Sequence, residues 1–181
     1  MILYVNACVR EQSRTNRIAA ELLKKLGGSY REVKLAETEI SPLTSERLQK
    51  RMELIERKDY SDKSFDLAKQ FAAADTIVIS APFWDAAFPS ILKVYLENIY
   101  VLGIVTEYGE GGKIHGLCKA DKLYYVTTSG GPYVPDYSYN YVKALAENCF
   151  GIKETSLIKA EMLDVQGYDA EEIVKRTINS L

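Results

Sequence analysis

The sequence predicts a doubly wound α/β fold, in which helices cover both faces of a parallel sheet. Short apolar runs recur along the 181 residues, and most of them do not alternate apolar with polar positions. Runs of this kind are typical of strands that are buried on both faces. Amphipathic helical patterns lie between the runs, and strands that alternate with helices are the pattern of this fold class.

Five of the apolar runs are candidate strands. They span Ile2–Val5, Tyr30–Leu35, Thr76–Ser80, Leu123–Thr127 and Ser156–Ala160. Five strands separated by helices suit the flavodoxin-like strand order 2-1-3-4-5. We therefore expect a five-stranded parallel sheet in that order, with helices on both of its faces.

The helices are predicted from apolar stripes at helical spacing and from the residues that stop them. The first predicted helix has an apolar stripe at Ile18, Leu22, Leu23 and Leu26 and is stopped by Gly27-Gly28. The second has a stripe from Phe88 to Ile99 and is followed by Gly103, and the third has a stripe from Tyr141 to Phe150 and is closed by Gly151. The last helix is expected from about Asp169 to Ser180. Asp169 is the expected N-cap of the last helix.

The segment Leu43–Asp75 is longer than one crossover between strands needs. It is highly charged between Glu46 and Lys63, so we expect two helices, one of them partly facing solvent. No internal repeat, low-complexity tract or linker interrupts the chain. Residues 1–181 are therefore predicted to form one domain.

The overall composition excludes several classes of function. A formal net charge of −2 gives no basic footprint for nucleic acid. The chain has no run of about 18 apolar residues, so no membrane span is expected, and no basic segment precedes Met1–Val5 as in a signal peptide. Three cysteines without a Cys-x-x-Cys pair and a single histidine suggest neither a disulfide framework nor a metal site. We expect a cytoplasmic protein.

Polar residues follow the first strand, where the first helix begins. Ser13 can cap that helix and leave free backbone N–H groups, which attract phosphate together with the helix dipole. The hydroxyls of Ser13 and Thr15 add donors, and Arg14, with Arg10 as a second candidate, adds positive charge. The chain has neither the Rossmann nor the P-loop glycine motif, which favours a mononucleotide such as FMN. An ordinary capped helix is the alternative.

An aromatic loop follows the third strand at Pro82, Phe83, Trp84 and Asp85. The proline stiffens the turn, and the residues after it can offer backbone N–H groups to the edge of a heterocycle. The rings of Phe83 and Trp84 offer a planar apolar surface to an isoalloxazine or an aromatic substrate. Trp84 as a plain core residue is the alternative, but the adjacent Asp85 argues against deep burial.

A glycine-containing loop, Thr128-Ser129-Gly130-Gly131, follows the fourth strand. Its glycines let the backbone approach a ligand closely and permit positive φ. Tyr133 and the nearby Tyr137, Tyr139 and Tyr141 either line a substrate pocket or form a dimer interface. Ligands of open α/β sheets bind outside the carboxyl ends of the strands, so the three loops are predicted to form one site.

The three loops resemble those of the FMN-dependent NADH-azoreductases and NAD(P)H:quinone reductases, a family with a flavodoxin-like fold. That family shows Ser-x-Ser-Asn after its first strand, Ala-Pro-Met-Tyr-Asn-Phe after its third and Thr-Ser-Arg-Gly-Gly after its fourth. The corresponding stretches here are Ser13–Asn16, Ala81–Ala86 and Thr128–Gly131. Leu92–Glu97 stands in place of Leu-Lys-Asn-Tyr-Phe-Asp, so the ordered resemblance covers nearly the whole chain.

The resemblance implies an FMN-dependent oxidoreductase that moves hydride in two steps, from NADH or NADPH to the flavin and then to a quinone, azo or nitroaromatic acceptor. The implied cofactor-binding residues are Ser13, Arg14, Thr15 and Asn16 at the phosphate, Pro82, Phe83, Trp84 and Asp85 beside the isoalloxazine, and Thr128, Ser129, Gly130 and Gly131 on its other side. Trp84 and Tyr133 are the candidate substrate contacts, and no side chain is expected to act as a catalytic acid or base.

The family's members are homodimers with flavin sites near the interface. We therefore expect a homodimer that uses the Phe88–Tyr100 helix and the tyrosine-rich loop. Two residues depart from the family pattern: Asp85 stands where the family has asparagine, and the arginine of the third loop is missing. A carboxylate at position 85 is expected to disfavour the anionic reduced flavin and to lower its potential.

Two other functions remain open from the sequence. Cys8, five intervening residues, Arg14 and Thr15 match the signature of tyrosine phosphatases, and Asp136 is a candidate acid for a low-molecular-weight enzyme of that type. Against it, the loop has no glycine to wrap around phosphate, and Glu11 would repel a dianion. The second alternative is a non-enzymatic, flavodoxin-like electron carrier.

Overall fold

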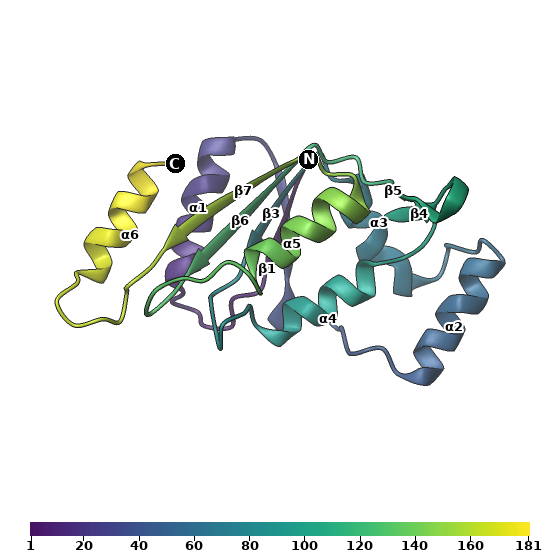
Figure 1. Ribbon diagram of the computed structural model, residues 1–181, viewed down its shortest axis with the longest axis horizontal. Helices are drawn as coiled ribbons and strands as arrows, with labels where there is room; N and C mark the ends of the chain where they lie inside the picture. The colour runs from purple at the N-terminus through teal and green to yellow at the C-terminus, as the bar shows by residue number, and fades with distance from the viewer.

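The computed structural model describes residues 1–181, and its centre is a five-stranded parallel sheet (Figure 1). The strands lie in the order β2-β1-β3-β6-β7, with bounds β1 Ile2–Asn6, β2 Tyr30–Lys34, β3 Thr76–Ser80, β6 Lys122–Thr128 and β7 Glu154–Ala160. Every neighbouring pair is parallel. In chain order this is the predicted 2-1-3-4-5 arrangement, so the predicted fold class is confirmed.

Burial differs between the centre and the edges of the sheet. All five residues of β1 are buried, as are Ile77–Ser80 of β3, because both strands lie between two helical layers. At the edge, β2 buries only Val33. The expectation of strands buried on both faces is therefore right for the central strands and wrong for β2, which has a neighbour on one side only.

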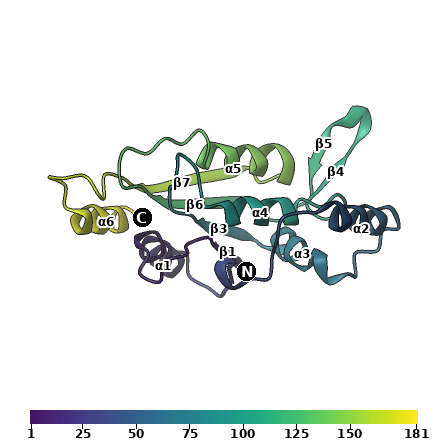
Figure 2. The same ribbon diagram turned by 90° about the horizontal axis from the view of Figure 1, so that it is seen from below.

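Helices cover both faces of the sheet (Figure 2). On one face lie α1 (Arg14–Leu26) and α6 (Ala170–Asn179), which share a buried cluster with β1, β3, β6 and β7. On the other face lie α3 (Asp66–Ala73), α4 (Ser90–Ile99) and α5 (Tyr139–Leu145), which share a larger cluster with the same sheet. Apolar contacts therefore fix the helices to the strands that carry the three loops.

The predicted helix signals are largely confirmed. Ser13 caps α1, and Asp169 caps α6 by accepting from the backbone N–H groups of Glu171 and Glu172. The predicted helix from Phe88 begins two residues later, at Ser90. The stripe that runs to Phe150 ends in a π-helical turn, Ala146–Phe150, after α5.

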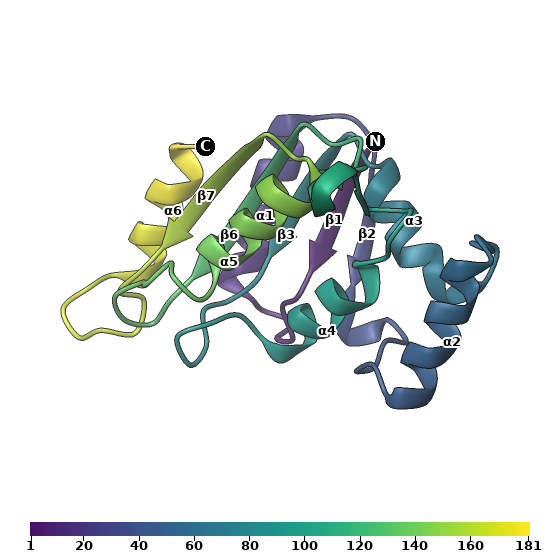
Figure 3. The same ribbon diagram turned by 45° about the vertical axis from the view of Figure 1, so that its right-hand side comes forward.

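The expectation of two helices in Leu43–Asp75 is confirmed, since α2 (Ser45–Glu56) precedes α3. None of the residues of α2 is buried, and the helix lies beyond α4 rather than on the sheet (Figure 3). Arg51 holds it there by donating to the carbonyl oxygens of Glu97, Asn98 and Tyr100 at 3.0, 3.0 and 2.6 Å. Such carbonyls at the end of a helix have no partner within the helix.

A hairpin that no sequence pattern predicted projects from the sheet (Figure 2). It is made of β4 (Thr106–Tyr108) and β5 (Ile114–Gly116). Gly116 lies so close to the main chain at Gly151 that a Cβ would meet the Gly151 nitrogen at 2.0 Å. Glycine at this position therefore lets the base of the hairpin pack against the end of the π-helical turn. None of the helices combines the length and the apolar character that crossing a membrane would require.

We predict that Arg51→Ala lowers the free energy of unfolding by about 1–3 kcal/mol, because three carbonyl oxygens lose a charged donor. Urea denaturation measures the change. Arg57→Ala, at an exposed arginine whose side chain makes no hydrogen bond, is the matched control and should leave stability within about 0.5 kcal/mol. Equal losses in both variants would contradict this role for Arg51.

Candidate functional site

The three predicted loops meet at one pocket of about 840 Å³. Strands β1, β3 and β6 pair in register, so that Asn6 lies opposite Ser80 and Ser80 lies opposite Val126. Their carboxyl ends therefore open at the same edge of the sheet. Of the predicted cofactor residues, those that line the pocket are Ser13, Arg14, Thr15, Pro82, Phe83, Trp84, Thr128, Ser129 and Gly130. Asn16, Asp85 and Gly131 do not line it.

The start of α1 supplies unpaired donors to this pocket. Ser13 accepts from the Asn16 N–H through its hydroxyl, at 3.3 Å, and from the Arg17 N–H through its carbonyl, at 3.1 Å. The backbone N–H groups of Arg14 and Thr15 have no acceptor within the chain. Thr15 also joins the first loop to the third, because its hydroxyl lies 2.7 Å from that of Thr128.

A buried polar network supports the floor of the pocket. The hydroxyl of Tyr4 donates to Asn16 Oδ1 at 3.0 Å and lies 2.9 Å from the hydroxyl of Ser80. Asn6 Oδ1 accepts from Ser80 at 3.3 Å and from the backbone N–H of Cys8 at 2.9 Å. Asn16, predicted as a phosphate ligand, therefore turns toward the sheet, where its side chain helps to fix the loop.

The aromatic loop closes on itself in a tight turn. The Trp84 N–H donates to the Ala87 carbonyl at 2.9 Å, and the Ala87 N–H donates back at 2.8 Å. Asp85 and Ala86, at the centre, both have positive φ, 50° and 64°. Two central residues in this region are typical of a type I′ turn, which ordinarily prefers Asn and Gly. The turn leaves Trp84 39% exposed, in agreement with the expectation that it is not a core residue.

Not all of the residues after Pro82 have a free backbone N–H group to offer a heterocycle. Phe83 donates to the Thr128 carbonyl at 2.9 Å, and Trp84 donates across the turn. The amides of Asp85 and Ala86 are the ones without an acceptor in the chain. Backbone bonding between the second and third loops therefore fixes Phe83, while the tip of the turn keeps free donors.

The glycine loop also differs from its prediction. Neither Gly130 nor Gly131 has positive φ. Gly130 allows a close approach instead, because a Cβ there would lie 2.5 Å from Oδ2 of Asp164 and this carboxylate would have to move. Tyr133, a predicted substrate contact, is 8% exposed and does not line the pocket. Its ring packs edge-on behind Phe83 at 4.9 Å between centroids, and its hydroxyl lies 2.8 Å from that of Ser138.

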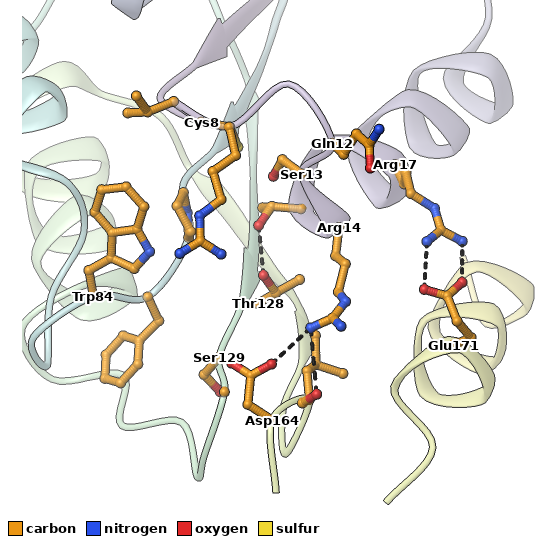
Figure 4. A pocket seen from close by; sticks show the side chains of 17 residues that line it. Cys8, Gln12, Ser13, Arg14, Arg17, Trp84, Thr128, Ser129, Asp164 and Glu171 are labelled. Atoms are coloured by element: carbon orange, nitrogen blue, oxygen red, sulfur yellow. Dashed lines mark hydrogen bonds and ion pairs between the residues drawn. The ribbon is translucent and has the colours of Figure 1, made fainter.

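The pocket also contains residues from the end of the chain that were not predicted from the sequence. Arg14 donates to Oδ1 of Asp164 at 3.0 Å, and Arg17 makes a two-point ion pair with Glu171 at 2.9 and 2.8 Å (Figure 4). Leu163, Asp164 and Glu171 all line the pocket. The segment after β7 carries no motif; the one local signal is its charge, and the fold alone brings it to the first loop.

Cys8 is buried at the edge of the pocket, and burial raises the pKa of its thiol despite hydrogen bonding from neighbouring hydroxyls. A phosphatase nucleophile needs the opposite shift, toward a thiolate at neutral pH. Asp136, the candidate acid, is exposed, accepts from Asn140 and does not line the pocket. The chemistry of this cysteine therefore does not fit the phosphatase alternative.

The chemistry of the pocket fits a flavin mononucleotide. The free amides of Arg14 and Thr15 and the hydroxyls of Ser13 and Thr15 suit a phosphate group, and Arg10, Arg14 and Arg17 also line the pocket. Phe83 and Trp84 provide the aromatic wall, and Figure 4 shows Trp84 and Arg14 on opposite sides of Thr128. The fold and the pocket define an α/β protein of the flavodoxin-like class.

Comparison with known proteins agrees with this class. The family model named Flavodoxin_2, described as the flavodoxin-like fold, matches residues 1–181, and the chain belongs to this family. An FMN-dependent NADH:quinone oxidoreductase of Coprothermobacter proteolyticus is 34% identical over 185 residues, which cover 96% of this chain and 92% of that protein. One from Clostridium acetobutylicum is 42% identical over 116 residues; that match covers 61% of this chain and spans 58% of the relative.

Solved structures show the same fold at lower identity. An azoreductase from Bacillus anthracis superposes with a TM-score of 0.85 at 20% identity, covering 99% of this chain and 95% of that one. An FMN-dependent NADH-azoreductase from the same species, solved in complex with FMN, gives a TM-score of 0.81 at 23% identity. The match covers 99% of this chain and 94% of that one.

We predict that Ala86→Gly stabilises the protein by about 0.5–1 kcal/mol. Glycine removes a steric cost of about 1–2 kcal/mol for a left-handed alanine and adds a smaller loss of chain entropy. Ala87→Gly, at the next residue, has no positive φ to relieve and should destabilise by about 0.5–1 kcal/mol. Urea denaturation of both variants measures the difference, and a loss of stability in Ala86→Gly would show that the turn is not strained.

Proposed function

We propose that this protein is an FMN-dependent NAD(P)H oxidoreductase that reduces quinone, azo or nitroaromatic acceptors. The observation that supports it best is the pairing of free amides at the start of α1 with the Phe83–Trp84 wall in one pocket. A relative named as an FMN-dependent NADH:quinone oxidoreductase is 34% identical over 96% of the chain, which supports the same cofactor and donor.

The residues of the chain have distinct roles in this proposal. Ser13 and Thr15, with the free amides of the first turn of α1, bind the phosphate. Phe83 and Trp84 hold the ring system, and Trp84 also contacts the acceptor from its exposed face. Ser129 and Gly130 close the other side. The chemistry that FMN supplies when bound is two-electron hydride transfer, so the protein's part is to orient its ligands and keep water out.

The visible spectrum of the purified protein, followed by anaerobic addition of NADH, tests this proposal. We expect flavin absorbance that bleaches with NADH and returns when a quinone is added. Flavin that binds but does not bleach with NADH or NADPH would indicate an electron carrier and contradict the enzymatic role. A protein that cannot be reconstituted with FMN would contradict every flavin-based function.

A second copy of the chain is our proposed partner, as a homodimer. An apolar groove of about 580 Å³ lies between α2, α4, β4 and α5, and most of its lining is hydrophobic. Its exposed members include Leu48, Met52 and Tyr108, which are 45%, 62% and 63% exposed. Contiguous exposed apolar surface of this kind is typical of protein interfaces. One wall of the groove is α4, which lies within the Phe88–Tyr100 segment that we expected at the dimer interface.

We predict that Met52→Glu shifts the protein from dimer to monomer, because a carboxylate would be buried without a partner at the interface. Light scattering after size exclusion measures the mass. Tyr30→Glu places the same charge at an exposed aromatic residue of the edge strand β2 and serves as the control, with the mass of the dimer retained. A wild-type protein with the mass of one chain would contradict the proposed dimer.

We predict that Asp85→Asn raises the midpoint potential of the bound flavin by roughly 5–20 mV. An exposed charge contributes about 0.2–1 kcal/mol, and about 30 mV corresponds to 1.4 kcal/mol for a two-electron couple. The carboxylate disfavours negative charge on the reduced flavin, and asparagine keeps the side-chain shape and tolerates positive φ. Spectroelectrochemical titration measures the potential, and an unchanged value would exclude this effect of Asp85.

A further inference from the structure

Three arginines line the pocket, and they differ in whether a carboxylate already binds them. Arg14 is paired with Asp164 and Arg17 with Glu171. Arg10 makes no ion pair and no hydrogen bond within the chain, and its side chain is exposed in the pocket. The only guanidinium of the three that is free to bind an anionic ligand without first losing a partner is therefore that of Arg10.

The pair of Arg17 and Glu171 belongs to the packing of two helices. Nη1 of Arg17 donates to Oε1 of Glu171 and Nη2 donates to Oε2, a two-point geometry that is favourable and specific for arginine. Glu171 lies in the first turn of α6, two residues after the cap Asp169, so the bond joins α1 to α6 on one face of the sheet (Figure 4). Arg17 is therefore used to hold the C-terminal helix in place.

In the pair of Arg14 and Asp164, backbone hydrogen bonds hold the segment that carries Asp164. The backbone N–H of Asp164 donates to the Gly130 carbonyl at 2.9 Å, and that of Leu163 donates to the Ser129 carbonyl at 3.2 Å. Gly130 has no side chain, which lets Oδ2 of Asp164 approach the glycine loop. A phosphate that approached Arg14 would meet this carboxylate as well, and the like charges would repel.

We propose that Arg10, and not Arg14, is the guanidinium that recognises the phosphate of FMN, and that Arg14 is a positioning residue that holds the Asp164 segment against the pocket. This inference rests on the proposed function. The phosphate would receive the charge-assisted bonds of Arg10 together with the free amides of Arg14 and Thr15. Asp164 then limits the positive charge at this end of the pocket.

The experiment compares FMN with riboflavin, which has the same ring system and no phosphate. The full chain is freed of flavin and titrated with each, and quenching of flavin fluorescence gives the two dissociation constants. In Arg10→Gln, the affinity for FMN should fall about tenfold to a hundredfold while that for riboflavin stays unchanged. Arg10→Lys keeps the charge and should recover part of the loss. Arg57→Gln, at an unpaired arginine far along the chain, is the control and should change neither constant.

Arg14→Gln separates the two arginines. It should weaken the binding of both flavins, and the ratio of their affinities should change less than in Arg10→Gln, because only the unpaired Asp164 carboxylate then disfavours the phosphate. Asp164→Asn should raise the affinity for FMN severalfold, because it removes the repelling carboxylate and releases Arg14. A thermal melt of each variant checks that it is folded.

The outcomes distinguish the inference from the function on which it rests. A loss of phosphate-specific affinity in Arg14→Gln, with none in Arg10→Gln, would overturn the assignment but leave an FMN enzyme. A change in the ratio of the KM values for NADH and NADPH in Arg10→Gln, with FMN affinity unchanged, would place the arginine at the donor's phosphate and also overturn it. A wild-type chain that binds neither flavin would contradict the proposed function itself.

Discussion

The register between β1, β3 and β6 is the constraint on which the pocket depends. These strands pair in parallel with no offset, so residues 6, 80 and 126 lie side by side and the chain leaves the sheet at one edge three times. Parallel pairing buries both faces of the central strands, and two helical layers cover them. A one-residue slip in β3 would reverse the facing of Ile77 and Val78 and would move Phe83 and Trp84 away from the first loop.

Backbone bonds then tie the loops to one another with little help from charge. Phe83 binds the carbonyl of Thr128, Ser129 binds that of Ala160, and Asp164 binds that of Gly130. The second, third and last loops thus continue the pairing of the sheet past the ends of its strands. The ion pairs of Arg14 and Arg17 act at the exposed rim, where such pairs contribute about 0–1 kcal/mol each. They fix positions more than they add stability.

The sequence predicted those features that neighbouring residues in the chain determine, such as strand bounds and helix caps. The run Thr76–Ser80 has the observed bounds of β3, and Ser13 and Asp169 are the caps expected from their type. The turn at Asp85 and Ala86 was missed because neither residue is a glycine, and the tolerance of aspartate for positive φ is only a weak signal. The β4–β5 hairpin was missed because its strands have only three residues each. Asp164 was missed because its partner, Arg14, is 150 residues away.

We propose that three loops at one edge of the sheet hold a flavin mononucleotide, with its phosphate at the start of α1 and its ring at Trp84. A crystal structure of the protein with bound FMN would test this arrangement. We expect phosphate oxygens within hydrogen-bond distance of the backbone N–H groups of Arg14 and Thr15, and the isoalloxazine against the Phe83–Trp84 loop. FMN bound elsewhere, or in this pocket with its phosphate away from the start of α1, would contradict it.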